Sequence, residues 1–138
     1  LVVNMQDVDA CHSDFTGYCN NLRKADYAVA HLWETIQNTP GMANDTIMIV
    51  APEHGRNLVP NSIVDAYGRK ALDHSSDATS REIFCLVLGP PNVVKQNNVI
   101  NSIKGESIDI VPTIANILGF DNSIAGQLQG SLLVDAFY

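Results

Sequence analysis

Short runs of apolar residues predict the β-strands of this chain. Residues 1–6, 46–51 and 83–88 are mainly apolar and have the length of buried strands, and the second run is rich in the β-branched residues that strands favour. Residues 99–103 are typical of a short edge strand. Each of the first three runs is followed by aspartate, proline or glycine, which marks the end of a strand.

Two other segments repeat apolar residues every three or four positions, which is the period of an amphipathic α-helix. The first covers residues 15–36, with Ser13 or Asp14 as its N-cap and a proline-glycine pair after its end. The second covers residues 108–118 and stops at Gly119. The pattern therefore predicts one long and one short helix.

Strands that alternate with helices indicate a layered α/β domain. We expect a three-layer α/β/α architecture with a mostly parallel sheet, in which ligands bind at the carboxyl ends of the strands. Residues 52–81 form a long polar stretch, with a short helix expected near residues 62–67. A loop of this length inside a compact domain is usually functional.

Composition and charge narrow the class of protein. The 138 residues, 46% hydrophobic and 17% charged, are predicted to form a single domain with a core. The chain has 15 acidic and 8 basic residues and a net charge of −7, so a surface that binds nucleic acid or an anionic membrane is not expected. The chain opens directly on the first apolar run, so we expect it to be an interior piece of a longer polypeptide.

Acids and histidines that suit a divalent metal ion follow two of the predicted strands. Asp9 and His12 come soon after the first strand, and Glu53 and His54 come directly after the second. Carboxylate oxygen and imidazole nitrogen are ligands of hydrolytic ions such as zinc and manganese. His74, in the long polar loop, can reach the first pair as a third ligand. This pattern predicts two neighbouring ions, which together stabilise the attacking and leaving oxygens of a displacement at phosphorus or sulfur.

Several residues have plainer interpretations. Asp7 competes with Asp9 as a ligand and equally suits a cap of the turn. A lone histidine after a strand is usually a polar loop residue, and His31 fits a surface or packing role on the long helix. Arg56 and Arg81 are as well suited to pairing with local acids as to contacting an anionic substrate.

Five motifs occur in an order known from one group of enzymes. They are residues 4–9 (NMQDVD) with His12, 46–56 (TIMIVAPEHGR), 73–74 (DH) with 79–90 (TSREIFCLVLGP), 107–114 (SIDIVPTI) and 130–133 (GSLL). Together they cover nearly the whole chain. The chain resembles the C-terminal part of the alkaline phosphatase superfamily, which includes sulfatases, nucleotide pyrophosphatase/phosphodiesterases, phosphopentomutase and cofactor-independent phosphoglycerate mutase.

The resemblance implies a role for each candidate residue. Asp9, His12 and His74 would hold one ion, and Glu53 and His54 would contribute to a second. Glu53 stands where the family has aspartate. The nucleophile of the family, a serine, threonine or formylglycine, and a further metal-binding aspartate belong to its N-terminal half, outside this chain. The resemblance therefore implies that the chain is a fragment of a larger catalytic domain whose N-terminal half is missing.

The implied activity is the metal-dependent hydrolysis of a small anionic phosphate or sulfate ester through a covalent intermediate. Two zinc or manganese ions would serve as cofactors, or calcium in a sulfatase-like member, and the isolated chain would be inactive. The localisation stays open, with the periplasm or secretion favoured for a sulfatase-like protein. The alternatives are a mutase or phosphotransferase with the same metal site, a degenerate non-catalytic α/β module, which the Glu53 departure favours, and a chain that retains a single ion.

Overall fold

The computed structural model describes residues 1–75, 77–120 and 129–138. The chain divides into two compact units, Leu1–Leu86 and Val87–Tyr138. All of the candidate site residues belong to the first unit. That the chain is one domain and part of a larger catalytic domain stays a prediction.

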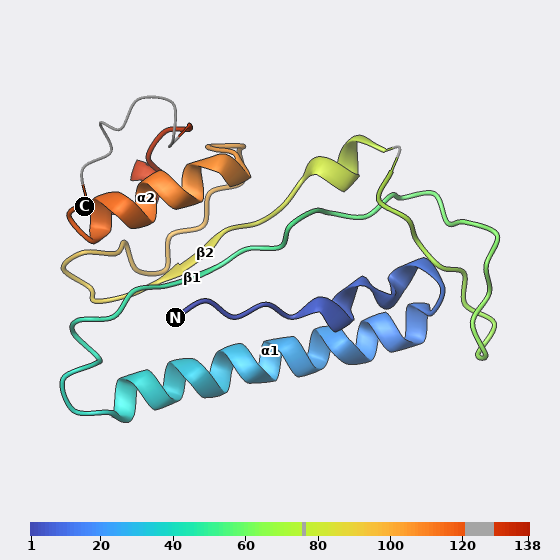
Figure 1. Ribbon diagram of the computed structural model, residues 1–138, viewed down its shortest axis with the longest axis horizontal. Helices are drawn as coiled ribbons and strands as arrows, with labels where there is room; N and C mark the ends of the chain where they lie inside the picture. Colours follow the sequence, from blue (N-terminus) through green and yellow to red (C-terminus); the bar gives the residue numbers. More distant parts are fainter. Residues whose placement is uncertain (76, 121–128) are drawn as a thin grey trace. The chain divides into compact units, whose positions relative to one another are not determined.

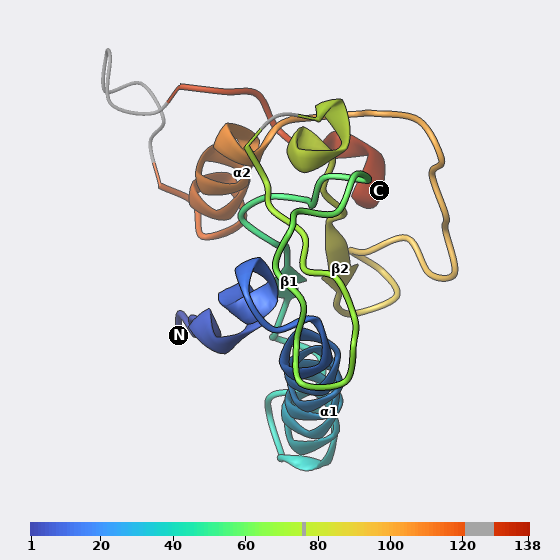
Figure 2. The same cartoon turned by 90° about the vertical axis from the view of Figure 1, so that its right-hand side faces the viewer.

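The first unit is built on a long helix with a short one beside it. The 3-10 helix η1 (Gln6–His12) packs against α-helix α1 (Phe15–Asn38), and both Figure 1 and Figure 2 show the two side by side in blue. The Asp14 carboxylate caps α1 by accepting a hydrogen bond of 2.8 Å from the Gly17 backbone N–H. The prediction of a helix over residues 15–36 is confirmed, and Asp14 rather than Ser13 is its N-cap.

The predicted three-layer α/β/α fold with a mostly parallel sheet is wrong. The described residues form two strands, β1 (Met48–Val50) and β2 (Leu86–Leu88), which pair in an antiparallel sheet. Parallel neighbours need a crossover connection, which is usually a helix. The described residues between the two strands contain only the short 3-10 helix η2 (Ala78–Arg81), and the chain therefore returns to β1 in the opposite direction.

Three smaller predictions of secondary structure are also wrong. Residues 1–6 form no strand: Leu1 and Val2 are fully exposed, and this apolar run pairs with no strand in the described part of the chain. Residues 99–103 form no strand either. The helix expected at residues 62–67 is replaced by a turn closed by a Val64–Lys70 bridge. The Asp65 carboxylate in this turn accepts hydrogen bonds from the backbone N–H groups of Tyr67 and Arg69, and these bonds compete with the hydrogen bonds of a helix.

The second unit is organised around Asp109. The 3-10 helix η3 (Ser107–Asp109) leads directly into α-helix α2 (Ile110–Ile117), so the helix predicted over residues 108–118 is present but its α-helical part begins at Ile110. Gly119, in a left-handed conformation, follows the C-cap Leu118 and marks the predicted stop. The Asp109 carboxylate accepts backbone hydrogen bonds from Glu106 and from Ser131, at 2.8 and 2.6 Å. This carboxylate thus fixes the approach of residues 129–133 to the start of α2. A last 3-10 helix, η4, covers Val134–Ala136.

Few apolar side chains are buried in the described part of the chain. The buried hydrophobic residues are Cys11, Ile36, Ala71, Val94 and Ala115. Hydrogen bonds and tight backbone approaches therefore contribute much of what holds the loops of the first unit in place. Within the described ranges, no helix has both the length and the hydropathy needed to span a membrane.

Candidate metal centre

The long polar loop folds onto the junction between η1 and α1. The Leu72 backbone N–H donates to the Cys11 carbonyl at 3.0 Å, and the Asn61 side chain donates to the His12 carbonyl at the same distance. On the other side of the junction, Thr16 donates two hydrogen bonds to Asp65. These contacts bring the loop histidines to the residues of η1.

Asp9 and His12 lie on the same side of η1. A 3-10 helix has three residues per turn, so side chains three positions apart eclipse one another. The Nε2 atom of His12 is 3.4 Å from Oδ1 of Asp9. His74 joins them from the loop, and one ligand atom from each of the three residues lies within 4.8 Å of the others. This is the first ligand set that the sequence predicts.

His54 also faces Asp9, whereas Glu53 does not join the group. The Nε2 atom of His54 lies 3.6 Å from Oδ1 of Asp9. Its ring stacks on His74 with the centroids 3.8 Å apart. Glu53 is exposed and makes no hydrogen bond or ion pair with a described residue. The structure therefore brings together four of the five predicted ligands.

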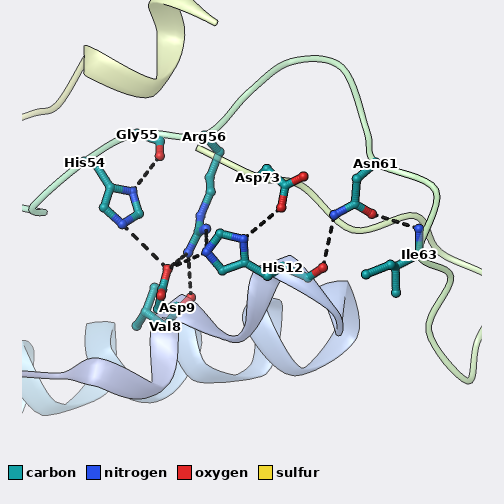
Figure 3. A network of polar contacts seen from close by, with 9 residues as sticks. All are labelled: Val8, Asp9, His12, His54, Gly55, Arg56, Asn61, Ile63 and Asp73. Atoms are coloured by element: carbon teal, nitrogen blue, oxygen red, sulfur yellow. Dashed lines mark hydrogen bonds and ion pairs between the residues drawn. The ribbon is translucent and has the colours of Figure 1, made fainter. Parts of the chain in front are cut away.

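Two of the imidazole rings are oriented by their second nitrogen. The Nδ1 atom of His12 is 2.8 Å from Oδ1 of Asp73, and the Nδ1 atom of His54 is 2.8 Å from the Gly55 carbonyl oxygen. Both acceptors require a proton on Nδ1, so the lone pair of each neutral ring resides on Nε2. Figure 3 shows these two nitrogens directed toward Asp9. Metal-binding histidines are commonly held by a carboxylate or a carbonyl in this way.

The spacing of these donor atoms fits a tetrahedral ion. Zinc bonds to nitrogen and oxygen are about 2.0–2.1 Å long, which places neighbouring ligand atoms of a tetrahedron roughly 3.3 Å apart. The distances from Oδ1 of Asp9 to the Nε2 atoms of His12 and His54, 3.4 and 3.6 Å, are close to this ligand–ligand distance. The set that includes His74 is wider, within 4.8 Å, and would contract around an ion. One carboxylate and several imidazoles suit zinc or manganese better than calcium, which prefers oxygen ligands.

Arg56 lies inside the same cluster. Its guanidinium donates from Nη2 to Oδ1 of Asp9 at 2.7 Å and to the Val8 carbonyl at 3.3 Å, and its Nη1 atom lies 3.5 Å from Nε2 of His12. The guanidinium carbon is 5.5 Å from the centroid of the Tyr18 ring, a cation–π distance. Arg56 therefore pairs with a local acid, one of the two roles that the sequence left open.

The acids of the cluster are stabilised in their charged form. Partial burial by itself raises the pKa of Asp9, but the hydrogen bond and the positive charge of Arg56 outweigh it and lower the pKa below the ordinary value. The hydrogen bond from His12 is the main cause that lowers the pKa of Asp73. Both groups are thus carboxylates at neutral pH, one in position to bind an ion and the other to orient a ligand.

The remaining candidates lie elsewhere. Asp7 is exposed, and its backbone carbonyl accepts a hydrogen bond from Asn21. His31 stacks on Tyr27 on α1, and Arg81 is exposed on η2. Sequence reasoning missed Tyr18, and it used Asp73 only as the neighbour of His74. An aspartate beside a candidate ligand is a usable signal for an orienting group, whereas no spacing in the sequence indicates the contact of Tyr18 with Arg56.

No protein-family model, curated protein or solved structure matches this chain.

Proposed function

We propose that this chain holds a divalent metal ion, zinc or manganese, at Asp9, His12 and His74, and that the ion serves the hydrolysis of phosphate or sulfate esters. The observation that carries the proposal is the cluster of ligand atoms from these three residues, which lie within 4.8 Å of one another, with Nε2 of His12 3.4 Å from one oxygen of Asp9 and Nδ1 of His12 held by Asp73. Such pre-orientation is expected of metal ligands, whereas surface histidines do not need it.

Three protein ligands leave one position of a tetrahedral zinc ion open, which is the arrangement of catalytic sites. A bound ion would supply Lewis acidity to an ester oxygen. In this proposal, Asp73 keeps His12 in the tautomer that can bind the ion. The nucleophile and the ligands of any second ion come from outside these 138 residues, as the resemblance to the alkaline phosphatase superfamily implies for the nucleophile and a further metal-binding aspartate. The exposed position of Glu53 supports a single ion on this chain.

Exposed apolar side chains on the second unit support a partner that covers them. Ile108, Val111 and Leu118 are each at least half exposed, at 50, 55 and 61%. A helix normally buries such a stripe against another element. We propose that the remainder of the catalytic domain covers these residues.

A second candidate is a structural metal site without catalysis. The 3.6 Å between His54 and Asp9 allows His54 to act as a fourth protein ligand, which would close the coordination sphere. In that case His54→Ala would weaken metal binding as much as His12→Ala. In the catalytic alternative, His54→Ala has the smaller effect.

The test measures metal content and ester hydrolysis in the longest natural form of the protein. We expect about one equivalent of zinc or manganese to depend on this chain, and His12→Ala and His74→Ala to lose it. His31→Ala, a histidine on the exposed side of α1, serves as the matched control and should retain the ion. Hydrolysis of nitrophenyl phosphate or nitrophenyl sulfate should disappear together with the ion. Absence of bound metal in the unsubstituted protein would overturn the proposal, and metal without hydrolysis would favour the structural site.

A further inference from the structure

Arg56 faces the same two atoms that would ligate the ion. Its Nη2 atom is 2.7 Å from Oδ1 of Asp9, and its Nη1 atom is 3.5 Å from Nε2 of His12. The side chain is only 12% exposed, so this charge is largely withdrawn from water. Figure 3 shows the guanidinium between the rings of His12 and His54 and above Asp9.

An ion bound to Asp9 and His12 would replace Arg56 as the contact of both residues. The lone pair on Nε2 of His12 cannot serve both an ion and an N–H donor, and a divalent ion on Asp9 neutralises the carboxylate that balances the guanidinium. What stays with Arg56 is the Val8 carbonyl, at 3.3 Å, and the face of the Tyr18 ring. These two contacts hold the guanidinium in place without supplying a negative charge. A partly buried cation that loses its anion is costly unless another anion replaces it.

We infer that Arg56 is the positioning residue for the anionic group of the substrate, and that it accepts this group only after the ion has displaced it from Asp9. This inference rests on the proposed metal-dependent function. A tetrahedral oxyanion, the shared chemistry of phosphate and sulfate esters, can bridge the ion and the guanidinium because the planar fork of arginine matches two oxygens of such an anion. Arg56 thereby couples the binding of ion and anion.

The experiment measures zinc affinity by competition with a chromophoric chelator, with and without inorganic phosphate, and in a second arm inorganic sulfate. In the unsubstituted protein, the anion should raise the zinc affinity, by about 5- to 100-fold for a typical coupling between two sites. In Arg56→Gln, zinc affinity without the anion should equal or exceed that of the unsubstituted protein, because the competing cation is gone, and the effect of the anion should vanish. Arg56→Lys keeps the charge but not the fork, so it should retain part of the coupling.

Arg81→Gln is the matched control, since Arg81 is exposed and forms no hydrogen bond or ion pair with a described residue. It should behave as the unsubstituted protein does. If zinc binds but the anion has no effect, or if Arg56→Gln and Arg56→Lys both keep the full effect, the inference about Arg56 is overturned while the metal site stands. If the unsubstituted protein binds no zinc, the proposed function fails together with the inference. The phosphate and sulfate arms show which oxyanion the site prefers.

Discussion

The Nδ1 atom of His12 and the Oδ1 atom of Asp73 lie 2.8 Å apart, although 61 positions separate the two residues in the sequence. The contact joins the 3-10 helix that carries Asp9 to the loop that carries His74. It also determines which nitrogen of His12 carries the proton. One hydrogen bond therefore links the placement of the loop to the chemical state of a candidate ligand.

Removal of the Asp73 carboxylate should weaken metal binding without removing a ligand. In Asp73→Ala, the His12 ring is free to rotate and to change tautomer, and zinc affinity should fall by about 10- to 100-fold, which is typical for loss of an orienting group. Asp73→Asn keeps an acceptor oxygen, so its zinc affinity should fall less than that of Asp73→Ala. Zinc competition with a chelator measures both variants. Asp45→Ala, in the exposed turn after α1, is the control, and an Asp73→Ala protein with the affinity of this control would contradict the assigned role.

Asp65 should make the stability of the first unit depend on pH. The Thr16 hydroxyl donates to its Oδ2 atom at 2.6 Å, and the backbone N–H groups of Thr16, Tyr67 and Arg69 donate at 2.9 Å. These hydrogen bonds, with that of the Thr16 hydroxyl as the largest cause, hold the pKa of Asp65 well below its ordinary value. Since the unfolded chain takes up this proton near pH 4 and the folded chain only at a lower pH, the contribution is complete above about pH 4 and is lost as the pH falls further.

Urea unfolding at a series of pH values measures this contribution. Asp65→Asn should be less stable than the unsubstituted protein at pH 7, and the difference should shrink as the pH falls below about 4. Asp26→Asn, an exposed position on α1, should leave the pH profile unchanged. A difference between Asp65→Asn and the unsubstituted protein that stays constant across this range would show that the carboxylate charge does not contribute.

The helices could be predicted because the features that form them are local. The apolar period, the Asp14 cap and the stop at Gly119 all lie within or beside the helices that they define. The sheet could not be predicted in the same way, because strand pairing depends on segments far apart in the sequence. Residues 46–51 and 83–88 do contain β1 and β2, yet nothing in either run says that the two strands are antiparallel neighbours. Residues 1–6 have the same apolar character and form no strand.

The candidate site was only partly predictable for the same reason. Asp9 and His12 are three positions apart, so their proximity is a local matter. The approach of His54 was expected from strand ends in a parallel sheet that the described residues do not form, whereas His74 was expected to arrive from the long polar loop. In the structure it depends instead on loop contacts such as the hydrogen bond from Asn61 to the His12 carbonyl. Such contacts have no periodic signature in the sequence.

Gly130 should be needed for its lack of a side chain as well as for its backbone conformation. Its φ is +107°, and a Cβ atom there would lie 2.7 Å from the Ile108 carbonyl oxygen and 2.8 Å from Oδ1 of Asp109. Gly119 also has a positive φ, of +72°, but a Cβ atom would meet nothing within 4 Å. Gly119→Ala should therefore cost about 1 kcal/mol of the free energy of unfolding, from backbone strain alone. Gly130→Ala should cost about 2–4 kcal/mol, because displacement of the backbone and of Asp109 is added. Chemical denaturation of both variants distinguishes the two effects, and equal losses would mean that the close approach does not matter.

Gly55 links the geometry of the backbone to the proposed site. Its N–H donates to the Ser80 carbonyl at 2.8 Å, and a Cβ atom would collide with the carbonyl oxygens of Thr79 and Glu82, which belong to the backbone and cannot swing away. Gly55 also separates His54 from Arg56 and accepts the hydrogen bond that orients the His54 ring. Gly55→Ala should push this turn away from residues 79–82 and displace both neighbours, so that zinc affinity falls by about tenfold or more.

Gly41→Ala is the control for Gly55→Ala. Gly41 has a φ of +83° and open space around it, in the turn after α1, so the alanine variant should lose stability but keep its zinc affinity. Thermal unfolding and zinc competition on the two variants separate a general loss of stability from a displaced site. Because the Gly55 backbone meets η2 at close range, a variant with unchanged zinc affinity would mean that the site adapts to a shift of this turn, and that loop contacts elsewhere hold His54 in place.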